Sequence, residues 1–261
     1  MGGNLFKESK RMESKEEFQN AIQEQRVRFP NLKLIVPRQL KDKETFGDLD
    51  MLVETDAEEI RKVLDAEGLK HSTNGRVLSY LDPNNYQVDL IQIPEDRLMY
   101  AWCFFSDGDL GNILGRMVKN VYHLKNSFLG LYYVYRPDDT GNYNQEFLVS
   151  LCYEELIILL GLNIQKWQRG FETQDELFEW IYASKYLNTG IFKLENLNNK
   201  NRVRDRKRKF YNAWLEFLAG KEPKIPTTNK ISVLDVFPGF AEEYDRCHAE
   251  YLETKLLKIK E

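Results

Sequence analysis

Hydrophobic residues in the first third of the chain alternate between helix-like and strand-like spacing. Ser14 followed three residues later by Glu17 is a helix-capping pattern. The apolar residues that come next lie on one helical face: Phe18, Ala21 and Ile22. The pattern predicts a helix that begins near residue 15.

Two short apolar runs follow this helix, residues 31–40 and 48–54, and both have the composition of β-strands. A second helix is predicted after them, because Thr55 and Glu58 repeat the capping pattern and Gly68 closes the segment. Its core face consists of Ile60, Val63 and Leu64. The predicted order is therefore helix, strand, strand, helix.

Residues 76–81 and 86–93 are two further apolar runs, and the segment 82–85 between them, Asp-Pro-Asn-Asn, is rich in turn residues. This arrangement predicts a β-hairpin. Beyond Pro94 the spacing is mainly helical, apart from a tyrosine-rich extended stretch at 128–136. Mixed strands and helices followed by a mainly helical C-terminal region indicate the α+β fold class.

The composition is that of a soluble globular protein, with 261 residues of which 42% are hydrophobic and 30% are charged. No apolar run approaches the ~18 residues of a membrane span, so no membrane partner is expected. The three cysteines lack CxxC spacing, and we expect Cys103, Cys152 and Cys247 to be reduced core residues of a cytoplasmic protein. The scattered histidines disfavour a zinc cluster.

The net charge of −4 indicates no general affinity for nucleic acid, but residues 200–209 carry seven basic residues and one acidic residue. Such a block can bind phosphates, and it can equally be the solvated face of a helix. The candidate contacts to nucleic acid are Lys200, Arg202, Arg204, Arg206 and Arg208. The apolar stripe after the block is predicted to be core: Phe210, Trp214, Phe217 and Leu218.

The run at residues 48–54 begins with two aspartates on one face, because side chains alternate along a strand. Asp48 and Asp50 repel each other there, and a bound cation would offset that repulsion. Asp89 is a third candidate, since an isolated carboxylate within YQVDLIQI is costly to bury. If the two strands are neighbours, three oxygen ligands converge without His or Cys, which favours Mg²⁺ or Mn²⁺.

Three carboxylates can hold two metal ions ~4 Å apart, an arrangement that supports in-line phosphoryl transfer. In that chemistry Asp89 could also accept the proton of the attacking hydroxyl. The alternative is structural: Asp48 caps a turn after Gly47, and Asp89 pairs with a nearby arginine. A G-D-x-D pattern is common by chance, so the pattern alone leaves both alternatives open.

The stretches KETFGDLDMLV and VDLIQIP together resemble the nucleotidyltransferase superfamily, and specifically the family X (polymerase-β-like) DNA polymerases. The matching positions are Glu44, Gly47, Asp48, Asp50, Leu52, Asp89 and Pro94. The resemblance continues through residues 94–116 at Phe104, Phe105, Ser106, Asp109, Asn112 and Arg116. Residues 152–162 are similar to the family's thumb segment. The resemblance covers about residues 32–165 and implies a polymerase-β-like palm with a mixed sheet.

The resemblance implies that Asp48, Asp50 and Asp89 bind two Mg²⁺ or Mn²⁺ ions and form the catalytic centre. Gly47 would let its backbone approach the phosphates. Further contacts to the nucleotide are implied for the aromatic pair Phe104 and Phe105 beside the sugar, for Asp109 and Asn112 against the base, and for Arg116 toward the template or base pair. Ordinary core packing is the alternative for the phenylalanine pair.

The chain departs from the family where the triphosphate would bind. Pro37 and Arg38 replace the family's Gly-Ser, and Leu40 and Lys41 replace its two arginines. Gln87 stands where an arginine precedes the third carboxylate. We expect the positive charge to come instead from Arg38, Lys41 and Lys43.

The expected division is an N-terminal helical segment at 1–30, a palm-like catalytic domain at 31–125 and a thumb-like, helical region at 126–261. The segment before the palm is too short for the family's lyase and helix-hairpin-helix domains. We therefore expect the C-terminal region to supply any contact to nucleic acid.

Three functions are compatible with these features. The first is transfer of a nucleoside monophosphate from an NTP or dNTP to a nucleic-acid 3′-hydroxyl, with release of pyrophosphate. The second keeps this chemistry and changes the acceptor to tRNA, a protein or a small molecule. The third is a non-catalytic protein that binds nucleic acid, which the retention of all three carboxylates disfavours.

Overall fold

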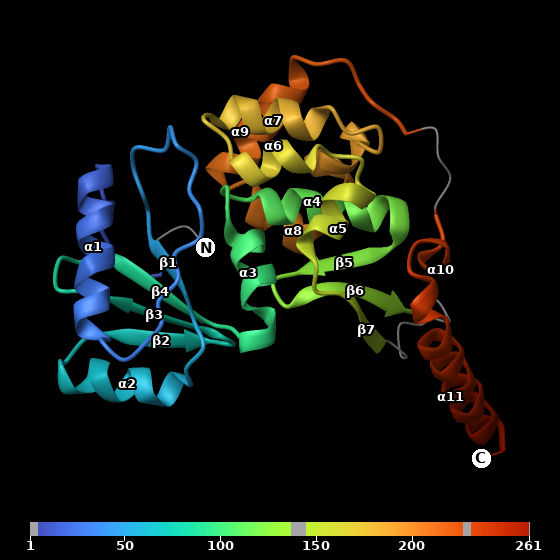
Figure 1. Ribbon diagram of the computed structural model, residues 1–261, viewed down its shortest axis with the longest axis horizontal. Coiled ribbons are helices and arrows are strands. Elements are labelled where there is room, and N and C mark those ends of the chain that lie inside the picture. The colour runs from blue at the N-terminus through green and yellow to red at the C-terminus, as the bar shows by residue number, and fades with distance from the viewer. Residues whose placement is uncertain (1–4, 137–144, 227–230, 261) are drawn as a thin grey trace.

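A computed structural model describes residues 5–136, 145–226 and 231–260, with side chains up to Glu253 in the last range. A sheet with two helices lies on one side of the molecule, and a larger, mainly helical part lies on the other (Figure 1). Helix α3 (Leu98–Phe105) lies between the two parts. The predicted mixed α+β class is therefore confirmed.

Four strands form the first sheet in the order β1-β4-β3-β2. Their bounds are Leu49–Val53 for β1, His71–Asn74 for β2, Val77–Leu81 for β3 and Gln87–Gln92 for β4. β1 runs parallel to β4, whereas β3 is antiparallel to both β4 and β2. The pair β3–β4 is the predicted hairpin, and Oδ1 of Asp82 supports its turn by accepting hydrogen bonds from the N–H groups of Asn84 and Tyr86.

The two faces of this sheet are covered differently. Helices α1 (Lys15–Arg28) and α2 (Ala57–Ala66) pack on one face, where Leu49 and Leu90 are fully buried. Leu52 points to the opposite face and belongs to the cluster that packs against α3. Because side chains alternate, the strand residues on either side of Leu49 and Leu90 also point toward α3.

The second part contains a three-stranded antiparallel sheet, in the order β5-β6-β7, and most of the helices. The strands are β5 Leu124–Ser127, β6 Gly130–Tyr135 and β7 Gln145–Ser150. The α-helices are α4 Leu110–Tyr122, α5 Tyr153–Leu159, α6 Ile164–Arg169, α7 Gln174–Tyr182, α8 Asn199–Asp205, α9 Lys209–Ala219, α10 Val233–Val236 and α11 Ala241–Lys260. Short 3₁₀ helices are η1 Glu95–Arg97, η2 Thr189–Phe192, η3 Leu194–Asn196 and η4 Pro238–Phe240. The tyrosine-rich stretch is β6, whereas β5 and β7 were not predicted.

Apolar side chains of these helices form the larger of the cores. Trp214 of α9 is fully buried against Phe178 of α7, with ring centroids 5.2 Å apart. Phe210 and Phe217 pack on the same cluster. Of the predicted core stripe, Trp214 is confirmed as core, whereas Phe210, Phe217 and Leu218 are only partly buried against it. The contacts of Phe210 and Trp214 with Phe178 hold α9 against α7. Helix α11 extends away from the body at the C-terminal end (Figure 1).

The helix caps of the first part agree with the sequence in one case and differ in the other. Ser14 caps α1, and its hydroxyl accepts a hydrogen bond from the N–H of Glu17 at 3.1 Å. Helix α2 is capped by Asp56 instead of Thr55, because the Asp56 carboxylate accepts the hydrogen bond from the N–H of Glu58 at 3.0 Å. The predicted second cap is therefore wrong by one residue.

Residues 31–40, all within the described chain, do not form the predicted strand. Ile35 makes an isolated antiparallel bridge to Leu52, and its neighbours continue as irregular chain. Pro37 lacks the N–H that a continued ladder requires. This segment instead connects α1 to the loop that precedes β1.

Two further expectations concern surface exposure. Cys103 and Cys247 are buried as predicted, but Cys152 is exposed, so it is not a core residue. Within the described residues, none of the helices combines the length and the hydrophobicity needed to cross a bilayer.

The cores are shared across the predicted domain boundaries. Phe18 of α1 lies in the same buried cluster as Leu49 of β1, so the N-terminal helix is part of the sheet's core. Leu114 of α4 lies in the larger cluster together with Trp214 of α9. The boundaries at residues 30 and 125 stay predictions.

Candidate metal centre and cleft

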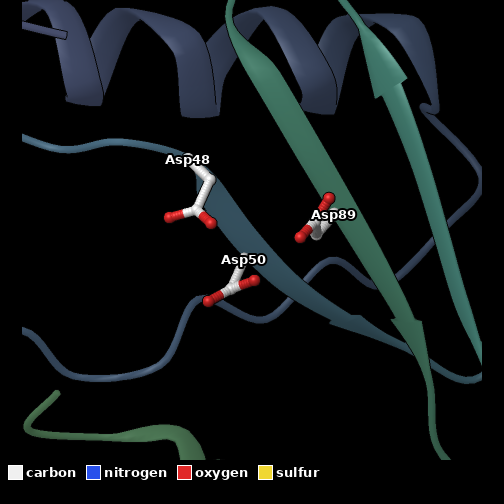
Figure 2. A group of neighbouring side chains, drawn as sticks. All are labelled: Asp48, Asp50 and Asp89. Carbon is white, nitrogen blue, oxygen red and sulfur yellow. The ribbon is translucent and has the colours of Figure 1, made fainter. Parts of the chain in front are cut away.

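Three aspartates on two neighbouring strands converge on one spot (Figure 2). Asp50 of β1 lies directly opposite Asp89 of β4 in the parallel pair. Asp48 lies just before β1 and points to the same side as Asp50. One carboxylate oxygen from each residue lies within 4.8 Å of the other two. The structure thus brings together the three carboxylates that the sequence singled out.

Burial and repulsion by neighbouring carboxylates disfavour the ionised forms of Asp50 and Asp89. Burial raises the pKa of Asp50 to about 7, with the charges of Asp48 and Asp89 adding to the rise and Lys43 opposing it. Burial also raises the pKa of Asp89, although hydrogen bonding from Ser79 and Gln87 favours its ionised form. A cation among the three carboxylates would reverse this cost.

Asp89 provides a test of whether the site fits a metal ion. Its Oδ1 accepts a hydrogen bond from Nε2 of Gln87 at 3.0 Å. Its Oδ2 is buried without a hydrogen-bond partner among the described residues, which is costly for a carboxylate. The donor set consists of carboxylate oxygens alone, the ligands that Mg²⁺ and Mn²⁺ prefer. The residues present therefore fit a hard divalent cation.

Asp48 and Asp50 line a cleft of ≈ 510 Å³. Its other walls come from the loop at residues 39–43, the end of α3, and the first turn of α9. The volume lies in the range typical of small-molecule sites, ~300–1,000 Å³. Four basic side chains line this cleft: Arg11, Lys43, Arg208 and Lys209. The cleft thus brings basic side chains together with the carboxylates of Asp48 and Asp50.

Lys43 is the predicted phosphate contact that lines the cleft. Its Nζ donates a hydrogen bond to Oε1 of Gln39 at 2.7 Å and lies 4.7 Å from the ring centroid of Phe46. Burial lowers the pKa of Lys43, while the charges of Asp48 and Asp50 oppose the change. The ammonium group is therefore held close to the carboxylates. Gly47, directly before Asp48, stays a predicted phosphate contact.

Arg38 and Lys41 make other contacts and do not line the cleft. Arg38 donates to both carboxylate oxygens of Asp107, at 3.1 and 2.6 Å, and to the carbonyl of Trp167 at 2.9 Å. Its guanidinium also lies over the ring of Trp167, 5.8 Å from the centroid. Lys41 pairs with Glu172. Arg38 links the loop before β1 to the segment after α3 and to α6, so its geometry favours a structural role over the predicted contact to a triphosphate.

The two phenylalanines at the end of α3 have different surroundings. Phe105 lines the cleft. Phe104 packs on Phe105 at a centroid separation of 5.3 Å and lies against Gly111 of α4. A Cβ at Gly111 would lie 2.4 Å from the carbonyl oxygen of Phe104, so the close contact requires glycine. Phe105 is therefore the member of the pair that can reach a ligand.

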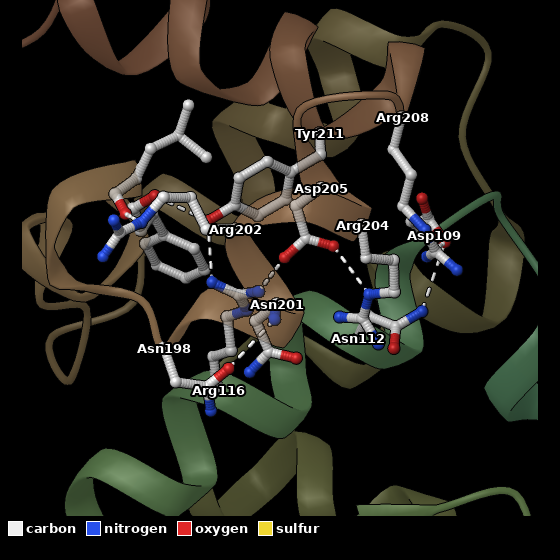
Figure 3. A network of polar contacts seen from close by, with 12 residues as sticks. Asp109, Asn112, Arg116, Asn198, Asn201, Arg202, Arg204, Asp205, Arg208 and Tyr211 are labelled. Atoms are coloured by element: carbon white, nitrogen blue, oxygen red, sulfur yellow. Dashed lines mark hydrogen bonds and ion pairs between the residues drawn. The ribbon is translucent and has the colours of Figure 1, made fainter.

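The predicted base and template contacts are held by the C-terminal helices (Figure 3). Asp109 lines the cleft and forms an ion pair with Arg208. Nδ2 of Asn112 donates to Oδ1 of Asp109 at 3.2 Å. Arg116 forms an ion pair with the buried carboxylate of Asp205 on α8. Arg116 therefore points into the contact between α4 and α8.

Arg116 has a second partner on α9. Its Nη1 donates to the hydroxyl of Tyr211 at 2.8 Å, and its guanidinium lies 4.8 Å from the centroid of that ring. With the ion pair to Asp205, these contacts fix α8 and α9 against α4.

The basic block at residues 200–209 is only partly a solvated face. Arg202 donates to the carbonyls of Leu194 and Leu197, and Arg204 pairs with Asp205. The exposed basic residues of the block are Lys200, Arg204, Arg206, Lys207 and Lys209. The guanidinium groups of Arg202 and Arg208 are therefore engaged in contacts within the protein. The exposed residues of the block stay candidates for contacts to nucleic acid.

Sequence reasoning missed several residues that line the cleft. Arg11 reaches it because the segment around it bridges to the sheet, with Lys10 beside Tyr86 and Met12 beside Phe46. No local signal identifies Arg11. The other missed lining residues are Gln39, Asp42, Gln174, Lys209, Phe210 and Ala213, and Arg208 was assigned only to nucleic acid. For the lining residues from the C-terminal region, the basic block at residues 200–209 was the one sequence feature that pointed to a binding role.

No protein-family model matches the chain, and no curated protein matches it.

Proposed function

We propose that the protein is a metal-dependent nucleotidyltransferase of the family X polymerase type. It would transfer a nucleoside monophosphate from an NTP or dNTP to a nucleic-acid 3′-hydroxyl and release pyrophosphate. The observation that carries this proposal is the convergence of Asp48, Asp50 and Asp89 beside a cleft lined by basic and aromatic residues. The resemblance to family X polymerases involves the same three residues.

The three carboxylates would hold two Mg²⁺ or Mn²⁺ ions. Bound there, these ions would lower the pKa of the attacking hydroxyl and neutralise charge on the triphosphate. Oδ2 of Asp89 has no hydrogen-bond partner among the described residues, which makes it the candidate atom to accept the hydroxyl's proton. Gln87 keeps the Asp89 carboxylate in place through its hydrogen bond to Oδ1.

The basic residues of the cleft would bind the phosphates. Lys43 interacts electrostatically with the carboxylates, since the charges of Asp48 and Asp50 both favour its protonated form. Arg11 lines the same cleft, and its Nη2 donates to the hydroxyl of Thr45 at 2.9 Å. These two cations take the place of the arginines that the sequence lacks, so they are the expected triphosphate contacts.

Phe105 and Phe210 would enclose the nucleoside. Both line the cleft, one from the end of α3 and one from the start of α9. Gly108 lies beside Phe210 with φ +73°, and a Cβ at this glycine would lie 2.7 Å from the ring. Glycine therefore lets the ring of Phe210 keep its position in the cleft wall.

A second candidate keeps the chemistry and changes the acceptor to tRNA, a protein or a small molecule. The contacts of Arg116 to Asp205 and Tyr211 favour it, because they fix α8 and α9 on α4 and α9 forms part of the cleft wall. An acceptor that presents a single hydroxyl group requires no space for a paired template.

The test is to incubate the full-length protein with α-phosphate-labelled NTPs and dNTPs and with Mg²⁺ or Mn²⁺. The acceptors are a primer–template, a single strand, a tRNA and the protein alone. The proposal predicts a labelled nucleic acid that disappears with Asp50→Asn. Label on a protein or a small molecule would support the second candidate. No labelled product under any condition, or equal labelling by Asp50→Asn, would contradict both.

A further inference from the structure

A second concave surface lies next to the cleft, with Gly111 and Asn112 in its lining close to Asp109 in the lining of the cleft. This groove has a volume of ≈ 660 Å³ and lies between α4, the strands β5 and β6, and α8. Its basic lining residues are Arg116, Lys119, His123, Lys125, Arg136 and Arg204. Within the part of the chain that the structure describes, Glu146 is the one acidic lining residue.

The groove keeps an excess of positive charge after its internal ion pairs are counted. Lys125 pairs with Glu146, and Asp205 pairs with both Arg116 and Arg204. Among the described residues, two carboxylates thus face five lysine and arginine side chains, which leaves three positive charges in excess. Lys119 and Arg136 are exposed and form no ion pair with the described residues. An anionic ligand is therefore the expected occupant.

The lining extends along the whole of α4. It begins at Gly111 and ends just beyond the helix at His123, which is ~18 Å at 1.5 Å per residue. A single phosphate would contact one part of this length. A nucleic-acid strand carries a phosphate every ~3.4 Å along a duplex axis, and fewer per length when extended, so several phosphates would fit along the groove. The charge distribution thus matches a polyanion better than a small anion.

Other lining residues match the chemistry of nucleotides. Tyr133 offers a partly exposed ring, and the side-chain amides of Asn112 and Asn201 line the groove. The amide of Asn126 is held by Tyr100 and the carbonyl of Gly111. A basic groove with an aromatic ring and amides is the combination that binds single strands with little sequence preference. We propose that this groove binds a single-stranded segment of nucleic acid. As the acceptor of the transfer reaction this strand rests on the proposed function, but its binding can be measured alone.

The test measures binding of fluorescein-labelled oligo(dT) and oligo(U) of about 12 nucleotides to the full-length protein by anisotropy. The measurements use EDTA, so that no transfer occurs. The variant Lys119→Ala/Arg136→Ala removes two exposed charges that have no ion-pair partner among the described residues. Its matched control is Arg76→Ala/Lys193→Ala, which removes one exposed lysine and one exposed arginine elsewhere.

We expect the groove variant to bind about tenfold more weakly and the slope of log K against log salt to fall by about 1.4, since each lost contact to a single strand contributes about 0.7. The control should bind like the wild type. Equal binding by wild type and groove variant, equal weakening by the control, or an absence of binding by the wild type would overturn the proposal. A preference for a duplex over both single strands would also overturn it.

The two proposals fail separately. Asp50→Asn should keep the wild-type affinity for the oligonucleotides, because Asp50 lies in the cleft and not in the groove. An absence of nucleotide transfer with intact, salt-dependent binding in the groove would reject the catalytic proposal alone. If the groove variant transfers nucleotides and binds the oligonucleotides as well as the wild type does, the groove proposal alone would be rejected.

Discussion

Asp50 and Asp89 lie directly opposite each other in the parallel pair of β1 and β4, although a helix and two strands separate them in sequence. Their side chains point away from the helix-covered face, where their neighbours Leu49 and Leu90 are fully buried. A shift of one residue in this register would turn one carboxylate into the core beneath α1. The register of a single strand pair therefore creates the candidate metal centre.

Asp50→Asn is the most informative change at this centre. We expect it to lower nucleotide transfer by at least about a thousandfold, because it removes a metal ligand. The fold should be retained, since the change also removes a charge that Asp48 and Asp89 repel. Steady-state transfer and urea denaturation of the purified variant test both expectations. Asp65→Asn on α2, on the opposite face of the same sheet, is the control and should change neither.

The stability of the metal-free protein should depend on pH through Asp50. Its pKa is about 7 in the fold and 3.8 ordinarily, so between these values the folded protein holds a proton that the unfolded chain has released. The free energy of unfolding should therefore fall as the pH rises from about 4 to about 7. The loss should be a few kcal/mol at most, at ~1.4 kcal/mol per pKa unit.

Urea titrations in EDTA at several pH values in this range measure how steeply the free energy of unfolding falls with pH. Asp50→Asn should flatten this slope, because the variant cannot ionise at this position. Mg²⁺ added at neutral pH should restore stability to the wild type and have little effect on the variant. An identical slope in both proteins would show that other groups cause the pH dependence.

Lys43→Met tests the source of positive charge in the cleft. Methionine keeps the apolar stem over Phe46 and removes the ammonium group. We expect the KM for the nucleoside triphosphate to rise about tenfold, because a phosphate contact close to the carboxylates is lost. Lys41→Met is the matched control, since Lys41 pairs with Glu172 outside the cleft. Equal effects of the two substitutions would contradict this assignment.

Arg38→Met should act on stability rather than on nucleotide binding. It would leave the carboxylate of Asp107, which is 1% exposed, without its ion-pair partner. Loss of one partner of a buried pair costs about 3–5 kcal/mol. The double variant Arg38→Met/Asp107→Asn should recover part of that loss, because it removes the unpaired charge.

The measurement for this pair is the free energy of unfolding of both variants, together with the KM for the nucleoside triphosphate. We expect the KM to stay near the wild-type value as long as the protein is folded. A stable Arg38→Met protein with a much higher KM would assign Arg38 to the triphosphate instead.

The metal centre could be predicted from the sequence because its determinants are local. Alternation places Asp48 and Asp50 on one face of a strand, and the Asp82 turn joins β3 to β4, which carries Asp89. The parallel pairing of β1 with β4 was an assumption that the fold supplies. The one-residue error at the cap of α2 arose because Thr55 and Asp56 are both capping residues.

Lys43 was the one cation of the cleft among the predicted phosphate contacts. The others could not be placed in the cleft from the sequence, because their positions depend on packing between distant segments. Arg208 reaches Asp109 only because α8 and α9 are fixed on α4 by Arg116. Arg11 reaches the cleft through isolated bridges of the N-terminal segment to Tyr86 and Phe46. The ion pair of Arg38 could not be predicted for the same reason, since its partner Asp107 lies in another loop. Sequence pattern identifies such residues as charged and does not identify their partners.

The most direct test of the central claim is the anomalous diffraction of crystals grown with Mn²⁺ and a non-hydrolysable nucleoside triphosphate. The account predicts manganese peaks among the carboxylate oxygens of Asp48, Asp50 and Asp89, with the phosphates directed toward Lys43. An ordered cleft with a bound nucleotide and no manganese at these three residues would contradict it.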